Sequence, residues 1–277
     1  MIVDSSTTDN DTLTITAEDE ANVAATVIGV ENIVFNIDAF GTSNGNSNEV
    51  EVSAENISAT NFSFNSTNAN STISALDLDS AADGSTVTTD SDFTTVNVDG
   101  DDNANLTVTA AGGTDIDVAA ATNALENVTV TSGATSGAVA VDTDSDETVT
   151  VTTATSGTTT VTADDADVVV VTTAGAAAVN ADAATSMTVS AKGTTTDSTI
   201  TSDDTDLVAV TLSGNAGAVD FNLEGAEEIA TVTIEGDQDV TVLMDAADIE
   251  GLTDDKVIVV DNSTATSTLA FATAAGT

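Results

Sequence analysis

The sequence predicts an all-β protein built as an elongated parallel β-solenoid, with about two main strands and ~20 residues in each coil. Three observations lead to this fold class. Short segments alternate apolar and polar residues, these segments recur at a regular interval, and proline is absent from all 277 residues. Alternation at every second residue is typical of a strand with one buried face. The absence of proline fits because each strand inside a solenoid needs its N–H groups for the next coil.

The first 104 residues contain alternating segments at uneven intervals. Examples are "TLTIT" from Thr12, "VEVS" from Val50, "FSFN" from Phe62, "LDLD" from Leu76 and "VNVD" from Val96. Threonine and valine are β-branched and favour strands, so we expect each segment to form one. The uneven spacing predicts less regular coils over residues 1–104, within a single elongated domain that spans residues 1–277.

From residue 105 to residue 277 the coils are expected to be regular, because the segments form two alternating series. Within each series the step is roughly 18 to 24 residues, which lies in the range of solenoid repeats. The first series consists of Leu106/Val108, Val128/Val130, Val149/Val151, Val168/Val170, Met187/Val189, Val208/Val210 and Val232/Ile234. The second consists of Ile116/Val118, Val139/Val141, Thr159/Val161, Ala177/Val179, Ser198/Ile200, Val219/Phe221 and Val240/Val242.

The turns after the two series differ in composition. First-series strands are followed by small turns such as "SGATSG" from Ser132, where glycine allows a tight corner. Second-series strands are usually followed by acidic turns, such as "DTDSDE" from Asp142 and "ADDAD" from Ala163. Stacked coils would therefore carry a column of carboxylates along one edge.

The alternative fold is a string of tandem Ig-like β-sandwiches, which also place a strand about every ten residues. Such domains usually carry a core tryptophan or tyrosine and some proline. This chain contains none of the three, so the solenoid is the preferred prediction.

The charge of the chain restricts its partners. It carries 47 acidic and 2 basic residues, for a net charge of -45. Nucleic acid and anionic membranes are not expected partners, because both require lysine and arginine. No stretch approaches the ~20 apolar residues of a membrane span, so no membrane insertion is expected. Cysteine and histidine are absent, which removes disulfides, Cys/His metal sites and most nucleophile–base pairs.

Calcium is the expected cofactor, because stacked carboxylates repel one another unless a cation lies between them. Ca²⁺ takes six to eight oxygen ligands in flexible geometry. The EF-hand reading of "DTDSDE" fails, since glycine is missing at the sixth position. The candidate ligands are Asp142, Asp144, Asp146, Glu147, Asp164, Asp165, Asp167, Asp203, Asp204, Asp206, Asp99, Asp101 and Asp102.

Several segments resemble bacterial surface-layer (S-layer) proteins of the Caulobacter-type, calcium-dependent β-helical family. "GVENIVFNI" (29–37), "ALENVTVTSG" (124–133) and "GAEEIATVTIEG" (225–236) are similar to the recurring coil signature of that family, and "TSGTTTVTADD" (155–165) is similar in composition. The resemblance implies calcium-held coils and lattice contacts, and export through a type I system. The chain departs from the family in its scarcity of tandem glycine–aspartate nonapeptides.

The expected function is that of an extracellular structural protein that forms a calcium-stabilised cell-surface array. Its expected partners are other copies of itself in a homo-oligomeric lattice, and cell-surface polysaccharide. The first alternative is a segment of a large calcium-dependent adhesin. The second is a β-helical polysaccharide-active enzyme using paired carboxylates. Aromatic residues, which typically line sugar clefts, make up 3% of the chain, so no enzyme activity is expected.

Overall fold

The fold is taken from a computed structural model, in which the chain divides into two compact units, Met1–Ala134 and Thr135–Thr277. Each unit is described by itself. Beyond residue 202 the description covers the backbone of the strands. The described residues are 1–6, 9–18, 21–38, 49–67, 73–101, 104–120, 125–135, 137–192, 198–202, 209–215, 219–222, 231–236, 240–244, 257–261 and 269–273.

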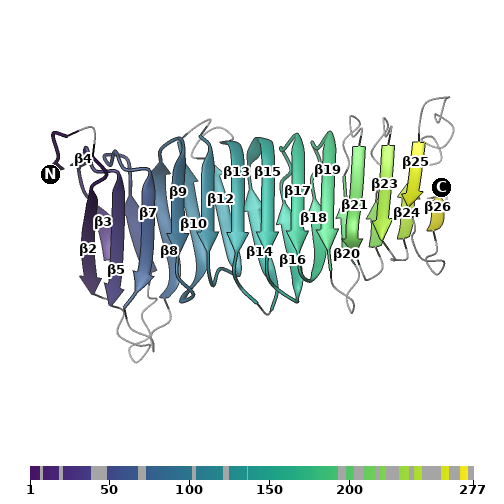
Figure 1. The fold of residues 1–277 in the computed structure, drawn as a ribbon, viewed down its shortest axis with the longest axis horizontal. Coiled ribbons are helices and arrows are strands. Elements are labelled where there is room, and N and C mark those ends of the chain that lie inside the picture. Colours follow the sequence, from purple (N-terminus) through teal and green to yellow (C-terminus); the bar gives the residue numbers. More distant parts are fainter. Residues whose placement is uncertain are drawn as a thin grey trace. The chain divides into compact units, whose positions relative to one another are not determined.

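Strands are the regular elements of both units in the part of the chain that is described (Figure 1). The first unit contains β1 (Ile2–Val3), β2 (Thr12–Glu18), β3 (Ala21–Ala24), β4 (Val27–Ile28), β5 (Asn32–Asp38), β6 (Glu49–Ser53), β7 (Asn61–Ser66), β8 (Ile73–Ala81), β9 (Ser85–Thr89), β10 (Phe93–Gly100), β11 (Leu106–Ala110), β12 (Asp115–Ala120) and β13 (Leu125–Ser132). The second contains β14 (Val139–Thr143), β15 (Ser145–Thr153), β16 (Thr158–Thr162), β17 (Val168–Thr173), β18 (Ala176–Asn180), β19 (Ser186–Ala191), β20 (Ser198–Thr201), β21 (Ala209–Asn215), β22 (Val219–Asn222), β23 (Thr231–Gly236), β24 (Val240–Met244), β25 (Val257–Asp261) and β26 (Leu269–Thr273).

Each unit is a parallel β-solenoid, which confirms the predicted fold class. In the first unit the β2 sheet has the order β2-β5-β7-β9-β11-β13, and the β3 sheet has the order β3-β6-β8-β10-β12. In the second, the β15 sheet contains the odd-numbered strands β15 to β25 and the β14 sheet the even-numbered strands β14 to β26. Neighbouring strands pair in parallel. The antiparallel sandwich alternative is therefore wrong.

The core of each unit is a set of ladders made by inward-facing residues of successive coils. In the first unit Phe35 stacks on Phe64 with ring centroids 4.7 Å apart and an interplanar angle of 3°, and Phe64 meets Phe93 edge-on at 6.4 Å. All three rings are fully buried. Such pairs add to the stability gained from burial, and the ladders hold the polar positions of each strand on the outer face.

The first coils of the first unit have a third, short side. β1 pairs in parallel with β4, and Val27 of β4 forms an isolated parallel bridge to Ile57. Gly29, which follows β4, has a φ of 77°. A Cβ there would lie 2.4 Å from the carbonyl oxygen of Asp4, so this corner requires glycine. The pairing of β1 with β4 fixes the position of Asp4.

Small corners are present after β13 and β15, as predicted, and a buried hydroxyl group closes each of them. Ser132 Oγ donates to the carbonyl oxygen of Gly113 in the preceding coil, at 2.6 Å, and accepts from the amide of Ala134. In the second unit Thr155 makes the same two bonds, to the Gly137 oxygen and from the Gly157 amide. A Cβ on Gly157 would meet the Gly137 oxygen at 2.0 Å. These corners therefore stack backbone on backbone, which leaves no room for a side chain.

Two details of the predicted register are wrong. In β17 the buried ladder contains Val169 and Val171, which align with Val149 and Val151, instead of Val168 and Val170. Residues 168–171 are all valine, so alternation could not indicate which pair faces inward. At β21, Val210 aligns with Met187 and Leu212 aligns with Val189. The predicted pair, Val208 and Val210, is therefore displaced by two residues.

Candidate cation-binding sites

The segment "DTDSDE" belongs to strands more than to a loop. Asp142 is an exposed residue of β14, Asp144 is half-buried between β14 and β15, and Glu147 is exposed on β15. The side chain of Asp146 lies outside the described residues. Thr143 and Ser145 alternate with the acids and are buried, so the chain runs from one strand into the next with Asp142 and Glu147 on the outer face.

The segment "ADDAD" forms a turn whose three carboxylates are exposed. Ala163 and Ala166 are fully buried and fix the turn, while Asp164, Asp165 and Asp167 face solvent. The turn rests on the next coil through its backbone, because the carbonyl oxygen of Asp164 accepts from the amide of Ala183 and that of Asp167 from Thr185.

An amide, rather than a second acid, partners Asp164. Asn180 Nδ2 donates to Asp164 Oδ1 at 2.7 Å. This bond lies between consecutive coils, where the sequence predicted a column of carboxylates. At this edge, the described side chains therefore include an acid, Asp164, that is paired with an amide, Asn180, of the next coil.

The remaining predicted ligands are only partly described. Asp99 is half-buried on β10, and Asp101 is exposed just beyond it. Asp102, Asp203, Asp204 and Asp206 lie outside the described residues. Among the described side chains, no three of the predicted ligands bring one oxygen each within 4.8 Å of one another. Calcium binding by these clusters stays a prediction.

An acidic outer face on the β3 sheet was missed by the turn-based prediction. The parallel register places Glu51 beside Asp77, Asp77 beside Asn97, and Asn97 beside Asp117. Adjacent strands lie about 4.8 Å apart, so these groups form a column across four coils. The signal was in the sequence, since "VEV", "LDLD" and "IDV" put acids at the polar positions of the strands.

Asp79 and Asp99 form a second acidic pair on this face, and their proximity affects the pKa of Asp99. Burial raises the pKa of Asp99 above its ordinary value, and the negative charge of Asp79 on the preceding coil raises it further. The two lysines of the chain are Lys192 and Lys256, so no basic side chain belongs to the first unit. No basic side chain of this unit therefore offsets the repulsion between Asp79 and Asp99.

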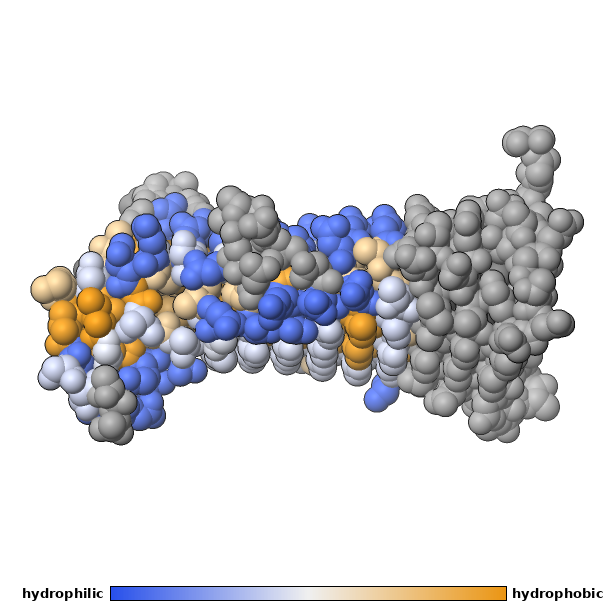
Figure 2. All heavy atoms as spheres, turned by 90° about the horizontal axis from the view of Figure 1, so that it is seen from above, coloured by the Kyte–Doolittle hydropathy of each residue, from blue (hydrophilic) through white to orange (hydrophobic). Residues whose placement is uncertain are grey.

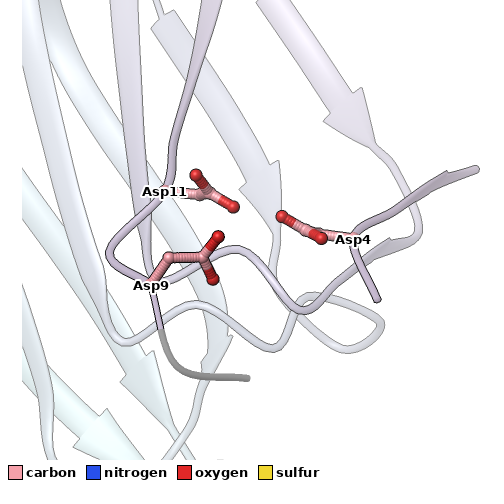
Figure 3. Close-up of side chains that lie close together, drawn as sticks. All are labelled: Asp4, Asp9 and Asp11. Atoms are coloured by element: carbon pink, nitrogen blue, oxygen red, sulfur yellow. The ribbon is translucent and has the colours of Figure 1, made fainter. Parts of the chain in front are cut away.

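Among the described residues, a compact group of three acids lies at the start of the chain. Asp4, Asp9 and Asp11 bring one carboxylate oxygen each within 4.8 Å of one another, and their side chains point toward a common centre (Figure 3). Asp4 follows β1, and Asp9 and Asp11 precede β2. The alternation of the sequence does not indicate this group, because the pairing of β1 with β4, which brings Asp4 close, has no signature in it.

Asp4 and Asp11 share a proton. The pKa of Asp11 is raised to about 6, mainly because its protonated carboxyl donates a hydrogen bond to Asp4, and further because Asp9, Asp4 and Glu31 repel its charge. The pKa of Asp4 is lowered, first by this hydrogen bond and then by the amide of Ser6, which donates to Asp4 Oδ1 at 2.8 Å. The amide of Asp11 donates to Glu31 Oε2 at 2.9 Å.

This arrangement has the chemistry of a hard-cation site. Carboxylate oxygens within 4.8 Å can bind one ion, because Ca²⁺–oxygen distances are about 2.3–2.6 Å and its geometry is flexible. A cation would displace the proton that Asp11 shares with Asp4, so binding would weaken as the pH falls below about 6.

Part of the β2 sheet presents a contrasting surface without charged side chains. An open groove of about 410 Å³ lies on it, lined by amide, hydroxyl and apolar side chains. Asn32 Nδ2 donates to Asn10 Oδ1 at 2.8 Å along its rim. The lining residues are Asn10, Thr12, Asn32, Ile33, Val34, Asn61, Phe62, Ser63, Thr86 and Thr88.

The fold and these faces define the chain as an acidic parallel β-solenoid. Comparison with protein-family models, with curated proteins and with solved structures finds no match. In the described part of the chain, no helix is long and apolar enough to cross a membrane.

Proposed function

We propose that this chain is a structural component of an extracellular, S-layer-like array, stabilised by divalent cations bound to its carboxylates. The observation that carries the proposal is the column on the β3 sheet, where Glu51, Asp77 and Asp117 recur across coils with Asn97 between them. A divalent cation between neighbouring coils converts repulsion into attraction and ties one coil to the next.

Calcium is the preferred ion on chemical grounds. The ligands on offer are carboxylate, amide and hydroxyl oxygens, which suit a hard cation of high coordination number. The group Asp4, Asp9 and Asp11 offers the most compact set among the described residues. The sequence resemblance to calcium-dependent S-layer proteins supports the same ion and an extracellular location.

Thermal unfolding followed by circular dichroism tests the proposal. The chain is melted in EDTA and then across a calcium titration at fixed ionic strength, with magnesium and sodium as controls. An ion present at 100 times its Kd stabilises the folded state by about 2.7 kcal/mol per site. We therefore expect Tm to rise by at least about 5 °C with calcium. Equal stabilisation by sodium at the same ionic strength would overturn the cation-site proposal.

Paired variants locate the sites. Asp4→Asn with Asp11→Asn removes two ligands of the compact group, and Glu51→Gln with Asp77→Asn removes two of the three charges of the column on the β3 sheet. Each pair should reduce the calcium-dependent rise in Tm. Thr88→Ser, on the uncharged part of the β2 sheet, should leave it unchanged.

The adhesin alternative is favoured by one observation, the neutral groove on the β2 sheet. Its amide and hydroxyl groups suit hydrogen bonding to a neutral polysaccharide. Binding of the chain to a panel of neutral glycans, abolished by Asn32→Ala and retained in Glu51→Gln, would favour a binding module over a purely structural role.

A further inference from the structure

The N-terminal end of the first unit leaves two strands with an open edge. Among the described strands, β2 has β5 as its single neighbour and β3 has β6. The backbone bond from the Asn32 amide to the Asp11 oxygen sets which groups of β2 face β5. Because these directions alternate along a strand, Leu13 and Ile15 direct their N–H and C=O groups to β5, while Thr12, Thr14 and Thr16 direct theirs to the open edge.

Apolar side chains are also left uncovered at this end (Figure 2). Leu13 and Ile15 are half-buried, whereas Ile33 and Phe35, their partners one coil inward, are fully buried. Ile2 and Val3 of β1 are 44% and 55% exposed. The end therefore offers unpaired backbone groups and apolar surface together, the combination that templates the addition of another strand.

The presence of two open strands, β2 and β3, restricts the kind of partner that can bind at this end. A single added strand would cover one sheet and leave the other open. Covering β2 and β3 together requires a coil with two strands, each parallel to its new neighbour and each with alternate apolar residues directed inward. The partner is therefore itself a parallel β-solenoid coil.

The chain contains such a coil at its other open strands. β25 has β23 as its single described neighbour, and β26 has β24. Ile258 and Val260 align in register with Val232 and Ile234, and these align through Val210 and Leu212 with the buried Met187 and Val189. Leu269 and Phe271 of β26 align with Val240 and Val242 in the same way.

We propose that the N-terminal end of one molecule docks the coil formed by β25 and β26 of a second copy, head to tail. Ile258 and Val260 would stack on Leu13 and Ile15, and Val259 would lie beside Thr14. A heterologous contact of this kind propagates into an open filament unless its rotation closes a ring. The inference names a surface for the self-association proposed above, and rests on that proposed function only for its dependence on cations.

Cross-linking tests the contact, because the chain contains no cysteine. Thr14→Cys and Val259→Cys variants are mixed and treated with a short bis-maleimide. Adjacent strands lie about 4.8 Å apart, so we expect cross-linked heterodimers in the mixture and none from either variant alone. The matched control is Thr88→Cys, an exposed residue in the same column of the β2 sheet but on the internal strand β9. Mixed with Val259→Cys, it should give no product.

A proline variant tests the open edge independently. Thr14→Pro removes an N–H group that faces away from β5, so it leaves the bonds between β2 and β5 in place. We expect the dissociation constant for self-association, measured by sedimentation velocity, to rise at least about tenfold. Thr14→Ala, which keeps the N–H, should associate like the parent chain. Circular dichroism melts confirm that both variants remain folded.

The outcomes separate the two proposals. Cross-linking of Thr14→Cys to itself, or association unaffected by Thr14→Pro, overturns the head-to-tail contact even if assembly requires calcium. Head-to-tail cross-linking that is equally efficient in sodium chloride with EDTA supports the contact and overturns the calcium requirement. If neither cross-linking nor sedimentation detects self-association at chain concentrations up to millimolar in calcium, the proposed contact is wrong.

Discussion

Buried hydroxyl groups inside the solenoid are of two kinds, paired and unpaired. In the second unit Thr153, Thr159 and Thr173 form a closed ring of hydrogen bonds, with oxygen–oxygen distances of 2.6, 2.9 and 2.9 Å. In the first unit Ser85 Oγ and Thr89 Oγ1 are buried without a hydrogen-bond partner among the described residues. A buried hydroxyl without a partner costs free energy, so the two kinds predict opposite effects of the same substitution.

Thr159→Val should destabilise the protein. The change keeps the shape of the side chain but leaves Thr153 and Thr173 each with one partner fewer inside the core. We expect the free energy of unfolding to fall by about 1–3 kcal/mol, measured by urea denaturation. An unchanged midpoint would mean that the ring contributes nothing.

Thr89→Val should stabilise the protein. Here the lost hydroxyl has no partner, and the added methyl group lies against the Phe64 ladder, since Thr89 aligns with Phe64. We expect the free energy of unfolding to rise by about 1 kcal/mol. A loss of stability in the same urea assay would show that Thr89 Oγ1 is satisfied in solution.

At the scale of single site residues, the sequence showed where acids are abundant but not which of them lie close together. The abundance of carboxylates indicated hard cations, and the exposed positions of Asp142, Asp164 and Asp165 agree with an acidic edge. The compact group around Asp4 depends on a two-residue strand, β1, pairing with β4. A strand that short carries no detectable periodicity, so sequence reasoning had no means of finding it.

At the scale of strands, alternation was sufficient to predict parallel solenoid sheets but insufficient to fix every register. Alternating apolar and polar residues determine which face is buried, and a one-residue slip moves every side chain to the other face. In β17 a run of four valines removes that information, and packing against Val149 and Val151 decides the register instead.

The acidic face of the β3 sheet predicts a substitution effect that depends on calcium. Asp99→Asn removes a half-buried charge that Asp79 repels, so Tm in EDTA at low salt should rise by a few degrees. If the Asp79–Asp99 pair helps to hold calcium, that advantage should shrink when calcium is added. Asp101→Asn, an exposed change of the same kind, is the control. A gain that persists undiminished in saturating calcium would argue against an ion at this pair.

At the scale of the whole molecule, the net charge of -45 makes stability depend on pH. Asp11 and Asp99 have raised pKa values, so the folded state holds more protons than the unfolded state at mildly acidic pH, and stability rises as the pH falls. Asp4 and Asp83 have lowered pKa values, and their contribution is lost only as the pH falls below their ordinary value of 3.8. The two effects together predict that stability is highest at an intermediate, mildly acidic pH.

Melts at low ionic strength in EDTA should show this optimum. We expect Tm to increase from pH 7 to about pH 5 and to decline below about pH 4. Asp11→Asn should flatten the rise that begins near pH 6, because it removes the group with a pKa of about 6. A Tm that falls steadily from pH 7 downward would contradict the assigned pKa shifts.

The parallel stacking of each coil on its predecessor also determines how the chain can acquire its structure. Aligned residues such as Thr107 and Thr129, or Thr150 and Val170, are about one coil apart in sequence. Each new coil therefore needs only the coil made just before it as a template, and no contact has to wait for a distant segment. A chain of this kind can fold in order as it emerges from a ribosome or a secretion channel, adding one coil at a time to a structure that is already complete behind it.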